Sequence, residues 1–199
     1  YLACGVQHVT QEAKKEHFPY GRGGERDGLF VADVILDNRR ELAQRFVSRQ
    51  DMGKCPDGEI LYESFCRQQE GTLSVARGAY ACAYLEPGKR TLTLFNDAVG
   101  NRSVYYFQED HRIYFSTLLS GITGLREKWQ ENTGWFDRFY AIRDLRAVSE
   151  PRETPYAGIL RLAPGEIAVF TGEGVHRREY WDPFLERKIL RGKTEVEYR

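Results

Sequence analysis

The chain has 199 residues, of which 41% are hydrophobic and 13% aromatic, enough for one sizeable core or two small ones. Lysine and arginine together number 29, as do aspartate and glutamate, so no net charge attracts nucleic acid or an acidic membrane surface. The four cysteines show neither a CxxC spacing nor a histidine at ligand spacing, which argues against a metal site and favours a reducing, cytoplasmic location. The sequence contains no 18-residue apolar run and no basic-then-apolar leader, so it predicts no membrane span and no signal peptide.

The N-terminal part predicts two strands separated by a loop. Residues 1–9 are typical of a short strand, and the polar, glycine-rich residues 10–28 are typical of a loop. The apolar run Leu29–Leu36 predicts a longer strand that is broken only by Asp33.

Two helices are expected next. Asn38 and Glu41 form a capping-box pattern at the start of the first, and Asp57 can cap the second. The inner face of the second helix would carry three apolar side chains, Ile60, Leu61 and Phe65.

The centre and the C-terminal part read mainly as strands. Residues 78–85 predict the first strand of a meander that continues through residues 91–116, where period-two apolar faces alternate with two turns. An amphipathic helix is expected around residues 135–142, and a final hairpin within residues 159–180. Two adjacent helices over one face of an antiparallel sheet make an α+β arrangement.

Several motifs resemble the asparagine-synthetase family's N-terminal, glutaminase-type domain. The stretch 91–116 is similar to the family's "A-R-D-x-x-G-x-x-P-L-Y-Y … F-A-S-E", with Asp97, Gly100 and Tyr106 among the matching positions. Four further blocks follow the family order: VADVILDNRREL at 31–42, PDGEIL at 56–61, GAYACA at 78–83, and ILRLAPG with YWDP between 159 and 183. The resemblance implies a four-layer α-β-β-α sandwich of the N-terminal-nucleophile-hydrolase type, with antiparallel sheets.

The resemblance also implies a domain organisation. Residues 1–183 would form the glutaminase-like, type-2 amidotransferase domain. Residues 184–199 would form a linker and the start of an ATP-dependent synthetase domain outside this sequence, with ATP and Mg as its expected cofactors. Partners would then be that C-terminal domain and its small-molecule or peptide substrate, and a homodimer is a further option. No cofactor is expected within these residues.

Glutaminase chemistry in this family needs an N-terminal cysteine whose own α-amino group serves as general base. Cys4-Gly5-Val6 resembles the family's "C-G-I" opening, but residues 1–3 precede it. Cys4 is therefore the candidate nucleophile if those residues are removed, and a vestigial one or a small buried strand residue if they are not.

The expected oxyanion site departs from the family pattern. The family holds the oxyanion with an Asn side chain and the following Gly N–H, and the matching pair here is Asp33-Val34. An ionised carboxylate cannot donate a hydrogen bond and repels a developing negative charge. The family's "R-L-S-I-x-D" segment, which grips the substrate carboxylate, has no counterpart between Gly5 and Asp33. Asp57 occupies the position that binds the substrate's α-ammonium in the family, although helix capping explains the same residue.

These departures favour a degenerate glutaminase-like domain with a structural or substrate-positioning role in an ATP-dependent amide-bond-forming enzyme, as in the front domains of lasso-peptide and β-lactam synthetases. Two alternatives stay open. One is a glutamine-hydrolysing domain of an asparagine synthetase, active once Cys4 is exposed. The other is a non-catalytic module that binds a peptide along a sheet edge.

Overall fold

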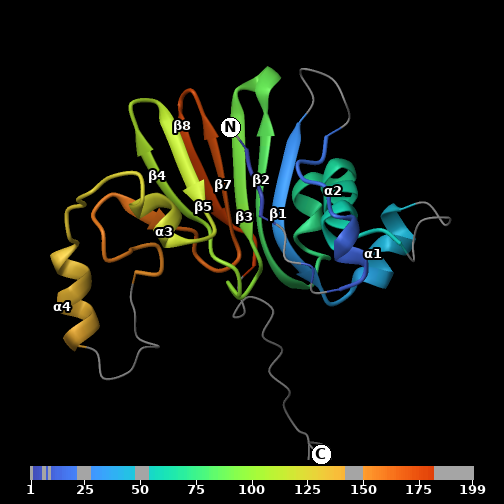
Figure 1. Ribbon diagram of the computed structural model, residues 1–199, viewed down its shortest axis with the longest axis horizontal. Helices are drawn as coiled ribbons and strands as arrows, with labels where there is room; N and C mark the ends of the chain where they lie inside the picture. Colours follow the sequence, from blue (N-terminus) through green and yellow to red (C-terminus); the bar gives the residue numbers. More distant parts are fainter. Residues whose placement is uncertain are drawn as a thin grey trace, which may run out of the picture.

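The computed structural model describes residues 2–5, 8, 10–21, 28–47, 54–141 and 150–181. The larger of its two sheets has five antiparallel strands in the order β1-β2-β3-β7-β8. These strands are β1 (Leu29–Leu36), β2 (Gly78–Glu86), β3 (Thr91–Asn96), β7 (Glu166–Thr171) and β8 (Gly174–Glu179). Its central strands, β2, β3 and β7, carry most of the buried residues of this sheet, because two helices lie on one face and the smaller sheet on the other (Figure 1).

The smaller sheet has three strands in the order β5-β4-β6, and it breaks the predicted meander. Its strands are β4 (Tyr105–Glu109), β5 (Arg112–Ser116) and β6 (Ile159–Arg161). The meander prediction is wrong at this point because β3 pairs with β7 and not with β4. Strands β4 and β5 pair with each other, and β4 pairs with β6, in the second sheet. Alternation predicts strands but does not identify their neighbours.

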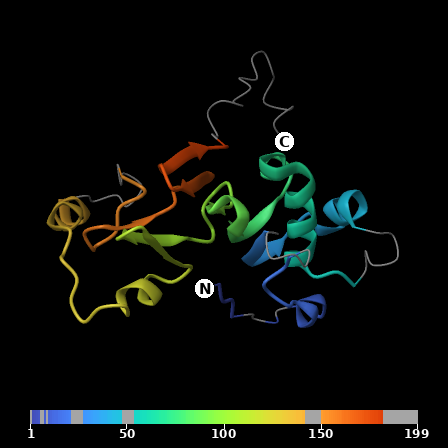
Figure 2. The same cartoon turned by 90° about the horizontal axis from the view of Figure 1, so that it is seen from above.

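Helices α1 (Arg39–Phe46) and α2 (Asp57–Gln68) cover the outer face of the larger sheet near β1 (Figures 1 and 2). The first hydrophobic core lies between them and the sheet, and it joins Phe30, Leu42, Ile60 and Phe95 with other buried residues. All three apolar side chains expected on the inner face of α2 are buried. Three short 3-10 helices span Glu12–Lys15, Gln69–Thr72 and Pro87–Lys89.

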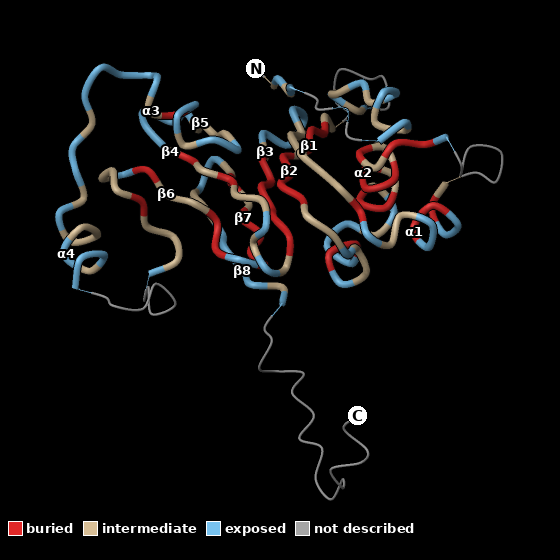
Figure 3. The backbone as a smooth tube through the Cα atoms, turned by 60° about the horizontal axis from the view of Figure 1, so that its bottom comes forward, coloured by how far each residue is buried: buried red, intermediate tan, exposed pale blue. Residues whose placement is uncertain are grey.

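The second core lies between the two sheets. Val31, Leu94 and Phe170 of the larger sheet pack there against Val104 and Tyr106. Helix α3 (Leu119–Thr123) packs against β4 and β5, and α4 (Thr133–Ala141) lies at the end of the molecule away from α1 and α2 (Figure 1). Figure 3 shows the buried residues concentrated on β1, β2, β3, β7 and α2, whereas α4 has none.

Helical segments thus flank two facing antiparallel sheets, and the expected α+β, α-β-β-α arrangement is confirmed. Residues 2–5 and 8 are not in a strand, so the N-terminal strand prediction is wrong for these described positions. The predicted third helix begins at Thr133, and Ile142 at its expected end lies outside the described residues.

The predicted cap is right in position at Asn38 and wrong at Asp57. Asn38 is the N-cap residue of α1, and its Nδ2 donates to the Glu41 carboxylate, but its side chain bonds no N–H of the helix. It also accepts from the Arg77 N–H and donates to the Val75 carbonyl, which ties α1 to the start of β2. Pro56 stands at the N-cap of α2, so Asp57 is the first helical residue. Both side chains form hydrogen bonds with residues that are distant in the sequence.

Candidate functional site

A cavity of about 500 Å³ opens between the two sheets beside β1. It is bordered by residues of the N-terminal segment, the 10–18 segment, β1, β2 and the end of β5. Its wall carries polar side chains, among them Cys4, Glu16, Asp33, Asp57, Arg102 and Ser116. Cys4, Asp33 and Asp57, which sequence reasoning singled out separately, therefore share one cavity.

Cys4 is half-buried in this cavity, and its Sγ lies 3.5 Å from the Ala32 carbonyl oxygen of β1. Burial raises the pKa of the Cys4 thiol above its ordinary value, and the carboxylates of Asp33 and Glu16 raise it further. A thiol with a raised pKa carries less thiolate at neutral pH, and the thiolate is the nucleophile. The surroundings of Cys4 therefore disfavour the reactive form.

Asp33 faces Arg102 across the cavity wall. The Asp33 Oδ2 atom lies 3.5 Å from the Arg102 Nε, and the two side chains are 43% and 38% exposed. The Nε atom itself is buried and has no hydrogen bond of good geometry among the described residues, so the contact is a loose ion pair. Val34 packs against the helix-covered core, which leaves Asp33 as the member of the predicted oxyanion pair that meets a charged neighbour.

Asp97 fixes the loop from which Arg102 extends. Its carboxylate is 1% exposed and accepts backbone N–H groups of Tyr80, Val99, Asn101 and Arg102 at 2.9–3.2 Å. The loop closes tightly at Gly100, where φ is +71° and an added Cβ would lie 3.0 Å from Pro164. Sequence reasoning identified Asp97 and Gly100 as a turn and a motif, but not Arg102 as a residue of the site.

Asp57 lines the cavity with both carboxylate oxygens already engaged. Oδ1 accepts from the Arg39 Nε at 2.8 Å and Oδ2 from the Leu36 N–H at 2.9 Å, and the side chain is 12% exposed. Asp57 thus ties α2 to α1 and to the end of β1. Its described contacts are structural, and its predicted role in substrate binding stays a prediction.

Glu16 is a site residue that the sequence did not reveal. Its carboxylate accepts the Tyr20 O–H and the Gly58 N–H, each at 2.7 Å. Gly58 lies in the first turn of α2, so Glu16 supplies the anion at this helix N-terminus in place of the expected Asp57 cap. Burial raises the pKa of Glu16, and the hydrogen bonds from Tyr20 and Gly58 oppose that effect.

The described residues hold no group of three His, Cys, Asp or Glu side chains that could bind a metal ion. Within the same residues, no helix has the length and apolar character needed to cross a membrane.

Comparison with known proteins identifies the fold and family. A family model described as "Glutamine amidotransferase domain" matches residues 7–124, more than half of the chain. The chain belongs to this family. A search of curated protein sequences gave no match.

Two solved structures share the fold of this amidotransferase domain. One is the glutamine phosphoribosylpyrophosphate amidotransferase from B. subtilis complexed with ADP and GMP, which is 15% identical with a TM-score of 0.51 over 81% of this chain. The other is described as the allosteric regulatory enzyme of purine biosynthesis and is 17% identical, with the same TM-score, over 82%. The present chain covers 31% of each of those chains. The likeness agrees with the predicted N-terminal-nucleophile-hydrolase-like fold.

The family match starts after Cys4 and ends before α4. It includes Glu16, Asp33, Asp57 and Arg102, the charged residues that line the cavity, and Asp97, which supports it. This amidotransferase domain therefore has a cysteine and a carboxylate on the wall of the same cavity, where the family pattern has a nucleophile and a hydrogen-bond donor.

Proposed function

We propose that this glutamine amidotransferase domain does not hydrolyse glutamine and serves as the N-terminal, structural or substrate-positioning domain of an asparagine-synthetase-type enzyme that forms amide bonds with ATP. The observation that carries the proposal is the carboxylate of Asp33, which lies in the same cavity as Cys4 and raises the pKa of its thiol.

The argument from chemistry has two parts. Attack of a cysteine on a carboxamide needs a thiolate, which burial and two carboxylates disfavour at Cys4. The tetrahedral intermediate then develops an oxyanion, which needs hydrogen-bond donors. Asp33 provides a negative charge instead, and the guanidinium of Arg102 on the cavity wall is already paired with that charge.

The synthetase half of the proposal rests on the resemblance of the motifs to the asparagine-synthetase family. It implies a following domain that binds ATP and Mg, activates a carboxylate and lets an amine attack it. An amine carried by the substrate itself would make ammonia from glutamine unnecessary, and the cavity beside Cys4 would then be free of selection for hydrolysis.

A working glutaminase is the second candidate, because Cys4 does line a cavity large enough for a small ligand. It requires removal of residues 1–3, so that the α-amino group of Cys4 becomes the general base. It also requires that Arg102 offset the charge of Asp33.

The test uses the complete polypeptide and a diazoketone analogue of glutamine, which alkylates a cysteine only when the active site activates it. We expect the intact mass to show no adduct at Cys4 in the native protein, and binding of Mg-ATP by the same preparation. Stoichiometric, Cys4-dependent labelling would overturn the absence of hydrolysis. Failure to bind Mg-ATP would overturn the synthetase assignment.

A further inference from the structure

The cavity between the two sheets is large enough for a small ligand, and much of its wall is apolar. Its volume of about 500 Å³ falls within the ~300–1,000 Å³ of small-molecule sites. Val31 and Ala83 of the larger sheet line one side, and Val104 and Phe115 line the side of the smaller sheet. Val31, Ala83 and Val104 belong to the buried core between the sheets, so this part of the wall favours an apolar group.

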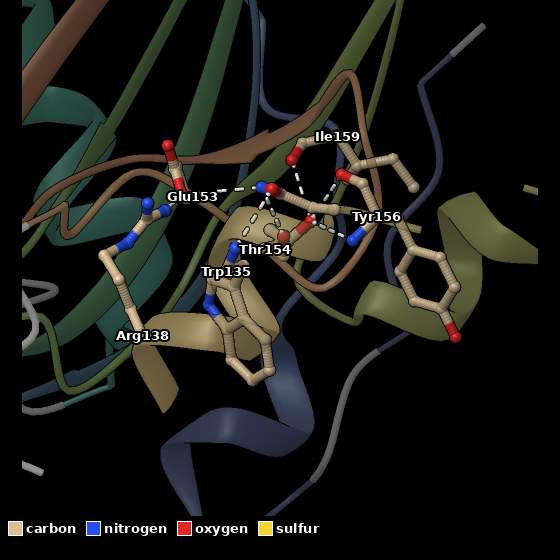
Figure 4. Close-up of polar contacts among 7 residues, drawn as sticks. Trp135, Arg138, Glu153, Thr154, Tyr156 and Ile159 are labelled. Atoms are coloured by element: carbon tan, nitrogen blue, oxygen red, sulfur yellow. Dashed lines mark hydrogen bonds and ion pairs between the residues drawn. The ribbon is translucent and has the colours of Figure 1, made fainter. Parts of the chain in front are cut away.

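The polar network before β6 is paired within the fold and is not a ligand site. Thr154 is buried and donates to the Ile159 carbonyl (Figure 4). Arg138 of α4 pairs with Glu153 in the same network (Figure 4). Buried polar groups that have such partners are structural.

The cavity wall holds one charged pair that the fold satisfies poorly. Both oxygens of Glu16 and both of Asp57 already accept hydrogen bonds from the protein. Asp33 and Arg102 are only loosely paired, at 3.5 Å, and each side chain is more than one-third exposed. Among the described residues, neither side chain makes a further hydrogen bond or ion pair. Because a carboxylate accepts and a guanidinium donates several hydrogen bonds, both charges retain capacity for a ligand.

Two opposite charges close together select a ligand that carries both. An ammonium group is attracted by Asp33, and a carboxylate group is attracted by Arg102. A ligand with one charge gains one of these contacts and is repelled by the other residue. An α-amino acid carries both groups on one carbon. Its side chain would extend along the apolar wall, where a polar group without a partner is disfavoured.

We propose that the cavity binds a free α-amino acid with an apolar side chain, with its ammonium group at Asp33 and its carboxylate at Arg102. The inference rests on the proposed function, because a cavity that positions glutamine for hydrolysis would hold a carboxamide, and not a charged head group, at the expected oxyanion site of Asp33. It also differs from the α-ammonium site at Asp57 that the resemblance implied, because Asp57 is already engaged.

The test uses leucine as the ligand and Cys4 as the local probe in the complete polypeptide. Cys4 lines the same cavity, so a bound ligand should slow its alkylation by iodoacetamide, measured by peptide mass mapping. We expect leucine to protect Cys4 with a saturable dependence on concentration. Isoamylamine, which lacks the carboxylate, and isocaproate, which lacks the ammonium, should each need at least tenfold higher concentrations. Glutamine should protect less well than leucine, because its carboxamide would meet the apolar wall.

Variants of the charged pair test the position of the ligand. Asp33→Asn and Arg102→Gln should each raise the half-protecting concentration of leucine at least tenfold, relative to the alkylation rate of the same variant without ligand. Both side chains are partly exposed, so we expect both variants to fold, and urea midpoints check this. Glu173→Gln, remote from the cavity, is the control and should leave the half-protecting concentration unchanged.

The outcomes separate this inference from the proposed function. Absence of protection by leucine, in a polypeptide that releases no ammonia from glutamine, would overturn the inference and leave the proposed function intact. Equal protection by leucine and either analogue would show that a single charge is enough, and equal protection by glutamine would show that the side chain need not be apolar; each would overturn the inference. Cys4-dependent release of ammonia would contradict the proposed function, while the two variants would still decide whether leucine binds at Asp33 and Arg102.

Discussion

At the scale of single residues, the cavity is defined by where its charges lie. Asp33 and Glu16 place two carboxylates near the Cys4 thiol, while Arg102 offers one guanidinium to Asp33. Because Asp33 and Arg102 are each more than one-third exposed, their attraction is screened and contributes little to stability. The charge of Asp33 has a larger consequence for the reactivity of Cys4, because it contributes to the raised pKa of the thiol.

Asp33→Asn should make Cys4 more reactive. Burial is the main cause of the raised pKa of the thiol, and the Asp33 charge is the next, so removing that charge lowers the pKa part of the way towards its ordinary value. A lower pKa raises the thiolate fraction at pH 8, so we expect alkylation of Cys4 by iodoacetamide to be faster in the variant, by about twofold or more. Peptide mass mapping gives the rate at Cys4. Glu173→Gln, remote from the cavity, is the control, and equal rates in Asp33→Asn and wild type would contradict the charge argument.

Asp97→Ala should be strongly destabilising, by about 3–5 kcal/mol, because four backbone N–H groups lose a buried, charged acceptor. Urea unfolding measures the change in free energy. A loss below about 1 kcal/mol would show that the loop does not depend on this carboxylate.

At the scale of elements, periodicity predicted β1 and α2 well because their apolar residues follow regular patterns. It failed where a polar side chain has a distant partner. Asn38 and Asp57 have the right chemistry for helix caps, yet neither side chain bonds an N–H of its helix. Besides Glu41, Asn38 binds residues 75–77, and Asp57 binds Arg39 and the Leu36 N–H. The partners at 75–77 and those of Asp57 are neighbours only in the folded chain, so a local pattern cannot show them.

The carboxylate of Glu166, at the start of β7, links this strand to Arg152 in the segment before β6, and Arg152 also pairs with Glu179 of β8. Glu166 is fully buried and accepts from the Arg152 Nε at 2.8 Å and from the Ala163 N–H at 2.7 Å. Arg152→Ala leaves this charge without its cation and should cost about 2–4 kcal/mol in urea unfolding. Arg178→Ala breaks an exposed pair with Glu70 and should cost less than about 1 kcal/mol. Equal losses in the two variants would contradict the distinction.

The contact of Glu16 with the start of α2 should make stability depend on pH. Its folded pKa is raised, so the native state binds the proton more tightly than the unfolded state, and stability falls as pH rises through that pKa. Glu16→Gln removes this titration. The stability of Glu16→Gln relative to wild type should therefore rise as the pH increases above about 4.5, measured by urea midpoints. If the stabilities of Glu16→Gln and wild type changed with pH in parallel, burial would not raise the pKa of Glu16 in the folded state, which would contradict the prediction.

At the scale of the whole molecule, the sequence motifs predicted the sandwich and brought Cys4, Asp33 and Asp57 to attention before their proximity was known. They did not predict Glu16 or Arg102, since neither residue stands in a motif of its own. Both enter the cavity because distant segments fold together: Glu16 meets the first turn of α2, and Arg102 extends from a loop that Asp97 closes. The sequence also did not predict that the aromatic side chains of α4 are not buried, because an amphipathic pattern does not show whether the apolar side of a helix is covered.

The most direct measurement is release of ammonia from glutamine by the complete polypeptide and by its Cys4→Ala variant, with the mature N-terminus determined by mass spectrometry. The account predicts the same background rate for both proteins, because the proposed function assigns Asp33 to the place of the family's oxyanion donor and the raised pKa of the Cys4 thiol disfavours the thiolate. Release that depends on Cys4 would contradict it and would make this domain a working glutaminase.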